Sequence, residues 1–443
     1  MVSHLKKFWY SINASYWFYP ALFSIAALAL AFLTIWLDRN GFAEFLNQVQ
    51  YVTMSRPDGA ANMLTVIAGS MIGVASTVFS ITIAAVAYAS GNYGPRLLTN
   101  FMEDKGNQLS LAVFIGTFVY SVTVLRTVRA ADEATRNPAP DETFLPGFVP
   151  QLSLLTAFVL TMLSVAVLVY FLNHIPSSIR INTVLEGIGK RLMREIEQVY
   201  PDAQNHDTEM HTPGGCPVRA ASPGYIQVID YEGLHTLAKE EDDILKLAVR
   251  TGDFVHEGRP LAYWENTHRD DALEAEVRGY FALGGMRTPA QDLHFLIDEL
   301  AEIGMRALSP GINDPFTAIT SLHWLGAAMH ELGKRDLVRK FGRADEASHD
   351  NLVLLDDDFA HYIQRGFGAM RSAVAGSRTA TLVAFDTLHG VTEGMDAGSR
   401  KTAVWQEGET LFAQTREKLS GPEADEVEAR FRMFEKRMDE AAV

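Results

Sequence analysis

The stretch MLTVIAGSMIGVASTVFSITIAAVAYA, residues 63–89, decides the fold because it is apolar throughout and contains no Asp, Glu, Lys or Arg. A helix that crosses a hydrocarbon core of about 30 Å needs about 20 such residues. Three more stretches have the same character, at about 17–37, 109–125 and 152–172. In a soluble protein, four such helices in succession would have no polar face to turn toward water. The sequence therefore predicts a multi-pass α-helical membrane protein, with residues 1–180 as its transmembrane domain.

Charge is distributed unevenly along the chain. Residues 1–180 hold 10 Lys and Arg against 9 Asp and Glu, whereas residues 181–443 hold 28 against 45 and carry a net charge of −17. Such an acidic half repels phosphate backbones, so no nucleic-acid partner is expected. The lipid bilayer is the expected partner of the apolar half, and an ion or a small ligand is a candidate partner of the acidic half.

The loops between the predicted spans indicate their orientation, because cytoplasmic loops are enriched in Lys and Arg. An even number of spans places both termini on one side of the membrane. The more basic side would carry Lys6, Lys7, Arg96, Lys105, Arg180, Lys190, Arg191 and Arg194. The other side would carry Arg39, Arg56, Arg126, Arg129 and Arg136. We therefore expect both termini in the cytoplasm.

The remainder of the chain is predicted to be a soluble α+β domain. Residues 181–201 show a helical period and should form a helix that leaves the membrane, whereas residues 202–223 are rich in helix breakers and indicate a linker. Residues 224–265 alternate in the manner of strands, and GDFVHEGRPL within them resembles half of a biotinyl/lipoyl-type sandwich barrel. The following residues lack the lysine that would carry such a cofactor, so a structural β module without a cofactor is favoured. Residues 272–443 are predicted to be helical.

Two helix starts are predicted in this last region from their capping residues. Thr288 followed by Pro289 predicts one start, with Gln291 at capping-box spacing. Asp314 followed by a proline predicts the other, after a rigid turn in which Asn313 tolerates unusual dihedral angles. A binding role for Asn313 and Asp314 is the alternative to this structural interpretation.

Two long runs resemble a known family. They are residues 76–129 and residues 281–325, and the second contains SPGINDPFTA. Both are similar to a large bacterial family of predicted inner-membrane proteins that is marked by this run. The resemblance implies a bacterial cytoplasmic membrane and a four-span layout. It brings no established activity and no catalytic residues.

Small and hydroxyl-bearing residues recur every three or four positions along one face of the second span. They are Gly69, Gly73, Ser76, Thr77, Ser80 and Ala84. This face suits close packing of helices, within one subunit or between the subunits of a homo-oligomer, or it lines a pore around a symmetry axis. At the end of the third span, Arg126 and Arg129 are either paired with Asp132 and Glu133 or form a ring of charge at a pore mouth.

One face of the helix predicted after residue 288 carries polar residues at intervals of four. They are His294, Asp298, Glu302 and Arg306. An imidazole and two carboxylates at this spacing could ligate a metal with help from another helix. Pairing of His with Asp, and of Glu with Arg, explains the spacing without a metal and is favoured, so no metal is assigned. The sequence lacks H-E-x-x-H, G-x-S-x-G, Walker and Rossmann motifs, which argues against an enzyme.

Three functions are compatible with these observations. The first is a homo-oligomeric channel or permeation pathway, lined by the second span and served by an acidic cytoplasmic vestibule or gate. The second is a membrane-anchored sensor or scaffold whose soluble domain binds a ligand or a protein. A membrane enzyme based on the His294 face is the third.

Overall fold

The computed structural model of the chain describes residues 15–42, 56–94, 96, 104–129, 147–200, 214–266, 271–339, 351–395 and 398–440. The chain divides into two compact units. We call residues 12–91 with 96–180 the membrane unit, and residues 181–443 with 92–95 the soluble unit. Several residues used in the predictions of orientation and charge pairing lie outside the described part: Lys6, Lys7, Asp132, Glu133 and Arg136.

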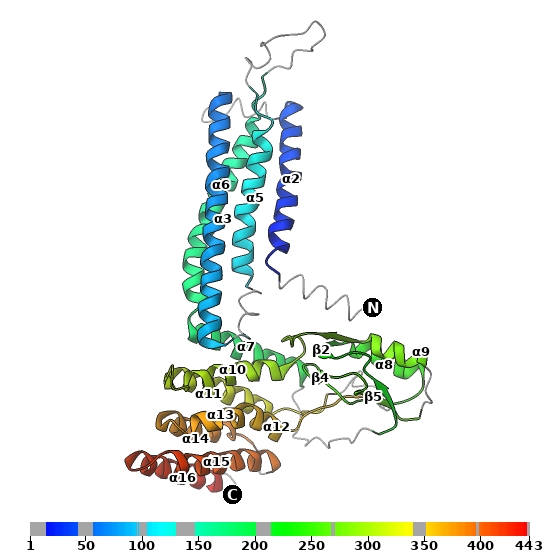
Figure 1. Cartoon of the computed structure of the whole chain (residues 1–443), viewed down its shortest axis with the longest axis vertical. Helices are drawn as coiled ribbons and strands as arrows, with labels where there is room; N and C mark the ends of the chain where they lie inside the picture. The colour runs from blue at the N-terminus through cyan, green and yellow to red at the C-terminus, as the bar shows by residue number, and fades with distance from the viewer. Residues whose placement is uncertain are drawn as a thin grey trace. The chain divides into compact units, whose positions relative to one another are not determined.

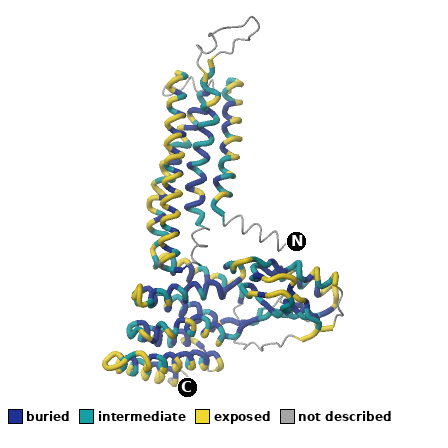
Figure 2. The backbone as a smooth tube through the Cα atoms, viewed as in Figure 1, coloured by how far each residue is buried: buried dark blue, intermediate teal, exposed yellow. Residues whose placement is uncertain are grey.

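The membrane unit contains four helices that are long and apolar enough to cross a membrane (Figure 1). They are α2 (Phe18–Arg39), α3 (Pro57–Tyr93), α5 (Lys105–Leu125) and α6 (Gln151–Ser178). The prediction of four spans is confirmed, and α3 extends beyond its predicted span at both ends. In α5, 56% of the apolar window is buried, compared with 22% in α2 and α6. Figure 2 shows α5 accordingly as the most buried of the four helices.

Polar contacts tie the helices of the membrane unit together at both ends of α6. Asp38, at the end of α2, accepts hydrogen bonds of 2.9 Å from the backbone N–H groups of Leu152 and Ser153. Asp104, which caps α5, lies 2.8 Å from Nε2 of His174 near the other end of α6. The first N–H groups of a helix have no partner within the helix, so Asp38 satisfies donors that would otherwise be left unpaired.

The soluble unit contains a stack of helices. The helix α7 (Ile181–Val199) packs against α10 (Leu293–Ala307) and α11 (Pro315–Leu332). The chain then forms α12 (Phe359–Ile363), the π-helical turn η3 (Gln364–Gly368), α13 (Ala369–Val374), α14 (Arg378–Val391), α15 (Ser399–Lys418) and α16 (Pro422–Glu440). Contacts run from α11 to α14 and from α14 to α16, which produces the layers visible in Figure 1.

Beside this stack lies a β region of two small sheets. One sheet has the strand order β1 (Cys216–Arg219), β5 (Pro260–Trp264), β3 (Leu245–Leu247) and β7 (Leu352–Val353); the other has the order β4 (Phe254–Val255), β2 (Gly224–Ile229) and β6 (Phe281–Gly284). All pairs are antiparallel except β3 with β7. Helices α8 (Tyr231–Glu240) and α9 (Asp271–Gly279) accompany the sheets. Their shared core includes Ile226, Leu234, Leu247 and Trp264.

Three features of the soluble unit differ from the sequence-based expectations. The strand β1 lies in the range read as a linker, of which residues 202–213 are outside the described part. The strands β6 and β7 lie in the range read as helical. The predicted helix start at Thr288 is wrong, because α10 begins at Leu293 with Asp292 as its cap. The backbone of Gln291 is left-handed, with φ 56°, so it does not continue an α-helix back to Pro289.

The second predicted helix start is confirmed. Asp314 caps α11 by accepting hydrogen bonds from the N–H groups of Phe316 (3.1 Å) and Thr317 (3.2 Å), and Pro315 is the first helical residue. Asn313 has a left-handed backbone, with φ 51°, as the predicted turn requires.

Candidate functional site

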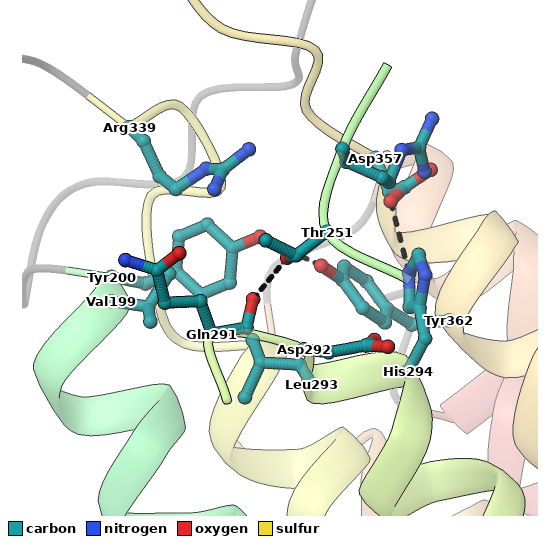
Figure 3. Close-up of a pocket in the computed structure, with 11 residues that line it drawn as sticks. Val199, Tyr200, Thr251, Gln291, Asp292, Leu293, His294, Arg339, Asp357 and Tyr362 are labelled. Atoms are coloured by element: carbon teal, nitrogen blue, oxygen red, sulfur yellow. Dashed lines mark hydrogen bonds and ion pairs between the residues drawn. The ribbon is translucent and has the colours of Figure 1, made fainter. Parts of the chain in front are cut away.

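A small pocket lies in the soluble unit where the β region meets the helices (Figure 3). Its cavity of about 40 Å³ has room for a few water molecules. Its polar lining comes from five segments that are far apart in the sequence: the end of α7, the turn after β3, the start of α10, and the segments around residues 339 and 357–362. The lining residues are Val199, Tyr200, Arg250, Thr251, Gln291, Asp292, Leu293, His294, Arg339, Asp357 and Tyr362.

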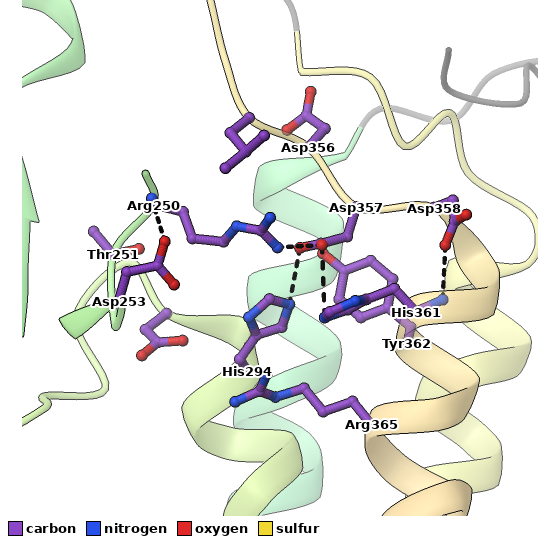
Figure 4. A network of polar contacts seen from close by, with 12 residues as sticks. Arg250, Thr251, Asp253, His294, Asp356, Asp357, Asp358, His361, Tyr362 and Arg365 are labelled. Carbon is purple, nitrogen blue, oxygen red and sulfur yellow. Dashed lines mark hydrogen bonds and ion pairs between the residues drawn. The ribbon is translucent and has the colours of Figure 1, made fainter. Parts of the chain in front are cut away.

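Two histidines converge on one carboxylate at one side of this pocket (Figure 4). His294 stands in the first turn of α10, and its Nε2 lies 3.0 Å from Oδ2 of Asp357. His361 stands in α12, and its Nε2 lies 3.6 Å from Oδ1 of the same carboxylate. The ligand atoms of these three residues all lie within 4.8 Å of one another. We call His294, Asp357 and His361 the His–Asp cluster.

Burial distinguishes the members of the His–Asp cluster. The side chains of His294 and Asp357 are 9% and 7% exposed, whereas that of His361 is 42% exposed. Even so, Nε2 of His361 is buried, like Nε2 of His294, and neither atom has a partner that meets hydrogen-bond geometry. Each nitrogen is therefore close to the carboxylate without a well-directed hydrogen bond to it.

Local structure holds the cluster in place. Asp358 caps α12 by accepting a hydrogen bond of 2.7 Å from the backbone N–H of His361, which fixes the turn between Asp357 and His361. Arg250 forms an ion pair with Oδ1 of Asp357. Arg250 is in turn placed by its backbone N–H, which donates to Asp253 at 3.1 Å. The carboxylate of Asp357 is thus oriented from the β region while the imidazoles come from two helices.

The electrostatics of the cluster favour an ionised carboxylate at Asp357. Burial alone would raise the pKa of Asp357, but the contact with His294 and the positive charges of His294, Arg250 and His361 outweigh it and lower that pKa to about 2. Burial lowers the pKa of His361 below its usual value, although Asp357 acts in the opposite direction. The carboxylate of Asp357 is therefore ionised at neutral pH.

Two buried tyrosines form the floor of the pocket. The hydroxyls of Tyr200 and Tyr362 are 2.7 Å apart and share a hydrogen bond. Burial raises the pKa of Tyr200 to about 12 and that of Tyr362 well above its usual value. Both hydroxyls consequently keep their protons at neutral pH. They can donate or accept hydrogen bonds but cannot act as bases.

The polar face predicted on residues 294–306 is present on α10, but its members have separate partners. His294 joins Asp357 and His361, as described. Asp298 accepts from Arg365 and from Arg287. Glu302 pairs with Arg306 at 3.4 Å, as the spacing of four residues predicts. The structure therefore does not bring His294, Asp298 and Glu302 together as one ligand set.

The other predicted sites are placed as follows. Asp314 is engaged as a helix cap and Asn313 is exposed in the preceding turn. Arg126 and Arg129 are exposed after the end of α5. The small-residue face of α3 is exposed along its length.

Sequence reasoning missed Asp357, His361 and Arg250. The run LLDDDFAHYIQR, residues 354–365, contains a signal that could have identified two of them, because a histidine follows a carboxylate by four residues. No spacing along the chain connects this run to His294 or Arg250. Their proximity arises only from the packing of α12 and the turn after β3 against α10.

Four apolar helices joined to an acidic α+β unit with a polar pocket define a multi-pass membrane protein with a soluble domain. Residues 13–389 match the family model described as "Predicted membrane protein (DUF2254)", and the chain belongs to this family. It is similar to uncharacterized proteins of Mycobacterium bovis and Mycobacterium tuberculosis, with 29% identity over 358 residues. The matched region covers 79% of this chain but just under two thirds, 66%, of each relative. No solved structure matches the chain.

Proposed function

We propose that the protein is a homo-oligomer whose α3 helices meet through their small-residue face and line a permeation pathway across the bacterial inner membrane. The observation that carries this proposal is the exposure of that face in the single chain. Its members Gly69, Gly73, Ser76, Thr77, Ser80 and Ala84 are all exposed. A Cβ atom added at Gly69 or Gly73 would meet nothing within 4 Å.

The opposite face of α3 supports the same interpretation. Leu64, Ile67, Met71, Ala75 and Val78 are buried in the core of the membrane unit. One face of the helix is thus already used for packing within the chain, while the small residues lie on the exposed face together with larger apolar residues such as Ile72 and Phe79. Small residues allow the backbones of two helices to approach closely in lipid, where no hydrophobic effect draws helices together. An exposed row of them is suited to contact with a second subunit.

The hydroxyls on this face are compatible with a water-filled path. Ser76, Thr77 and Ser80 donate hydrogen bonds of 2.9, 3.0 and 2.9 Å to the carbonyls four residues earlier. Their oxygens keep lone pairs that can accept a hydrogen bond from water or contact a cation. Weak polar groups of this kind line conduction paths, and the described spans carry no acidic or basic residue in mid-membrane. We therefore favour passive permeation over proton-coupled transport.

In this proposal both termini are cytoplasmic, and the soluble unit with its net charge of −17 forms a vestibule or gate. The support comes from the distribution of Lys and Arg among the loops. An acidic vestibule would concentrate cations near the entrance. A cation is therefore the favoured permeant.

Ion flux in proteoliposomes tests the proposal. The wild-type protein should release a loaded cation, and Ser80→Leu should reduce the flux because it places a bulky apolar group on the proposed lining. Ala29→Leu is the matched control, since it adds the same side chain to an exposed position of α2. The absence of flux for common cations and anions over a range of pH and voltage would contradict a permeation pathway.

A second candidate function is favoured by the pocket: a membrane-anchored sensor whose soluble unit binds a small ligand. Protonated tyrosines, Arg250 and the His–Asp cluster converge there, and convergent polar groups in a concavity are the usual features of a ligand site. Ligand screening by thermal shift on the full-length protein in nanodiscs tests it. Stabilisation that is lost in Tyr362→Phe would support it, and a screen without any stabilising compound would count against it.

A further inference from the structure

We propose that the His–Asp cluster binds a divalent transition metal ion of the Zn²⁺ class, with His294, Asp357 and His361 as ligands and a fourth position open toward the pocket. The inference rests on the second candidate function, ligand binding by the soluble unit, and specifies the chemistry of that ligand. It does not depend on whether α3 lines a pathway.

The donor atoms have the identity that such a metal prefers. Two imidazole nitrogens and one carboxylate oxygen form a set that Zn²⁺ and neighbouring metals use when three protein ligands leave a position open for water. Bonds of about 2.0–2.2 Å in a tetrahedral site separate the donors by about 3.4 Å. In this structure Nε2 of His294 lies 3.0 Å from Oδ2 of Asp357 and Nε2 of His361 lies 3.6 Å from Oδ1, and one ligand atom from each residue lies within 4.8 Å of the others. Rotation of the carboxylate and movement of the imidazoles toward one of its oxygens would bring the three donors to the separation that an ion requires.

The unpaired nitrogens provide a second, independent observation. Buried side-chain nitrogens in proteins nearly always have a hydrogen-bond partner. Here Nε2 of His294, on a side chain 91% buried, and Nε2 of His361 are both buried without one, and both are directed at the same carboxylate. A metal ion bonded to both nitrogens would satisfy them together.

The surroundings of the cluster suit an open metal site. Arg250 holds Oδ1 of Asp357, which leaves Oδ2 directed toward His294. Carboxylate ligands are commonly oriented by an outer partner of this kind. The adjacent cavity of about 40 Å³ can hold a water molecule as the fourth ligand. The site therefore has the three-ligand form of sites that exchange a water or a small molecule, rather than the closed four-ligand form of structural sites.

The test is metal binding by the full-length protein in nanodiscs after removal of metal with a chelator. We expect one Zn²⁺ per chain by elemental analysis after gel filtration, with affinity measured against a chromophoric chelator. His361→Ala should weaken binding at least about 100-fold, because loss of a ligand costs more than the 10- to 100-fold loss of an outer partner. His361 is the leading variant since its side chain is 42% exposed and its removal leaves little buried space. His323→Ala, on the exposed face of α11, is the matched control and should bind like the wild type.

Two results would overturn the metal site. One is the absence of stoichiometric Zn²⁺ in the wild-type protein at micromolar free metal. The other is equal affinity in wild type, His361→Ala and His294→Ala. Either result, combined with stabilisation of the wild type by a non-metal compound in the thermal-shift screen, would remove the metal while leaving the ligand-binding function in place. Should His294→Ala fail to fold, His361→Ala decides alone.

Discussion

Asp298 on α10 and Arg365 in the π-helical turn η3 form a bidentate ion pair. Nε of Arg365 donates a hydrogen bond to Oδ1 of Asp298 and Nη2 donates one to Oδ2, both at 2.8 Å. Arg287 adds a third contact to Oδ2 at 2.7 Å. A π turn shifts the helical register locally and occurs often at functional sites. Here it lies directly after α12, which carries His361. The ion pair therefore connects α10, which carries His294, to the turn that continues α12, which carries His361.

We expect Asp298→Asn to destabilise the soluble unit by about 1–3 kcal/mol at neutral pH, because the partly buried Arg365 loses its carboxylate partner, whereas Arg287 keeps Asp292. The melting temperature of the full-length protein in detergent measures this. Asp386→Asn removes an exposed partner of Arg430 and should cost no more than about 1 kcal/mol. Equal melting of Asp298→Asn and wild type at pH 7 would contradict the assigned role.

The same carboxylate predicts a pH dependence. Burial would raise the pKa of Asp298, but the hydrogen bonds and charges of Arg365 and Arg287 outweigh it and lower that pKa below the ordinary value of 3.8. The stability it contributes is therefore complete above pH 3.8 and is lost as the pH falls through the lower folded value. The gap in melting temperature between wild type and Asp298→Asn should be constant from pH 7 to about pH 4 and should narrow below pH 3.8, as the folded carboxyl begins to take up its proton. A gap that narrows already above about pH 4 would show that the pKa of Asp298 is not lowered in the folded protein.

Tyr362→Phe removes one partner of the 2.7 Å hydrogen bond between buried hydroxyls and leaves that of Tyr200 without this partner. A buried group left unpaired costs about 1–3 kcal/mol, so chemical unfolding of the full-length protein should shift accordingly. Tyr225→Phe, whose ring packs against the exposed Phe254, should change stability by about 0.5 kcal/mol at most. A Tyr362→Phe protein as stable as the Tyr225→Phe control would indicate that water replaces the lost partner.

Asp38→Ala should destabilise the membrane unit, because the N–H groups of Leu152 and Ser153 lose their acceptor at the start of α6. Loss of a capping group costs about 0.5–2 kcal/mol, and more where water cannot replace it. Unfolding in mixed micelles of increasing denaturing detergent measures the difference. Asp58→Ala, an exposed residue in the first turn of α3, is the control and should unfold close to wild type. Identical curves for the two variants would contradict a joining role for Asp38.

The membrane unit was predictable because each span depends on local composition. A helix in lipid satisfies its own backbone, so length and apolarity are sufficient to identify it. The start of α11 was predictable for a similar reason, since Asp314 and Pro315 act within one turn. At Thr288 the same type of signal failed, because Gln291 leaves the helical conformation and its carbonyl accepts a hydrogen bond from Thr251 instead.

The His–Asp cluster shows what sequence alone could not provide. The spacing of His294 and Asp298 suggested a ligand pair on one helix, but the carboxylate of Asp298 accepts hydrogen bonds from Arg365 and Arg287 instead. The carboxylate that meets His294 comes instead from Asp357. Contacts between residues so distant along the chain depend on tertiary packing, and periodicity contains no information about them.

The mass of the protein in nanodiscs or mild detergent tests whether the small-residue face of α3 joins subunits. We predict that the wild type is an oligomer. We also predict that Gly73→Leu dissociates toward the monomer while membrane insertion persists, because a bulky side chain enters a close contact between backbones. The control Ala29→Leu should retain the wild-type mass. A monomeric wild type, or a Gly73→Leu protein with unchanged mass and stability, would contradict the claim and leave this face in contact with lipid.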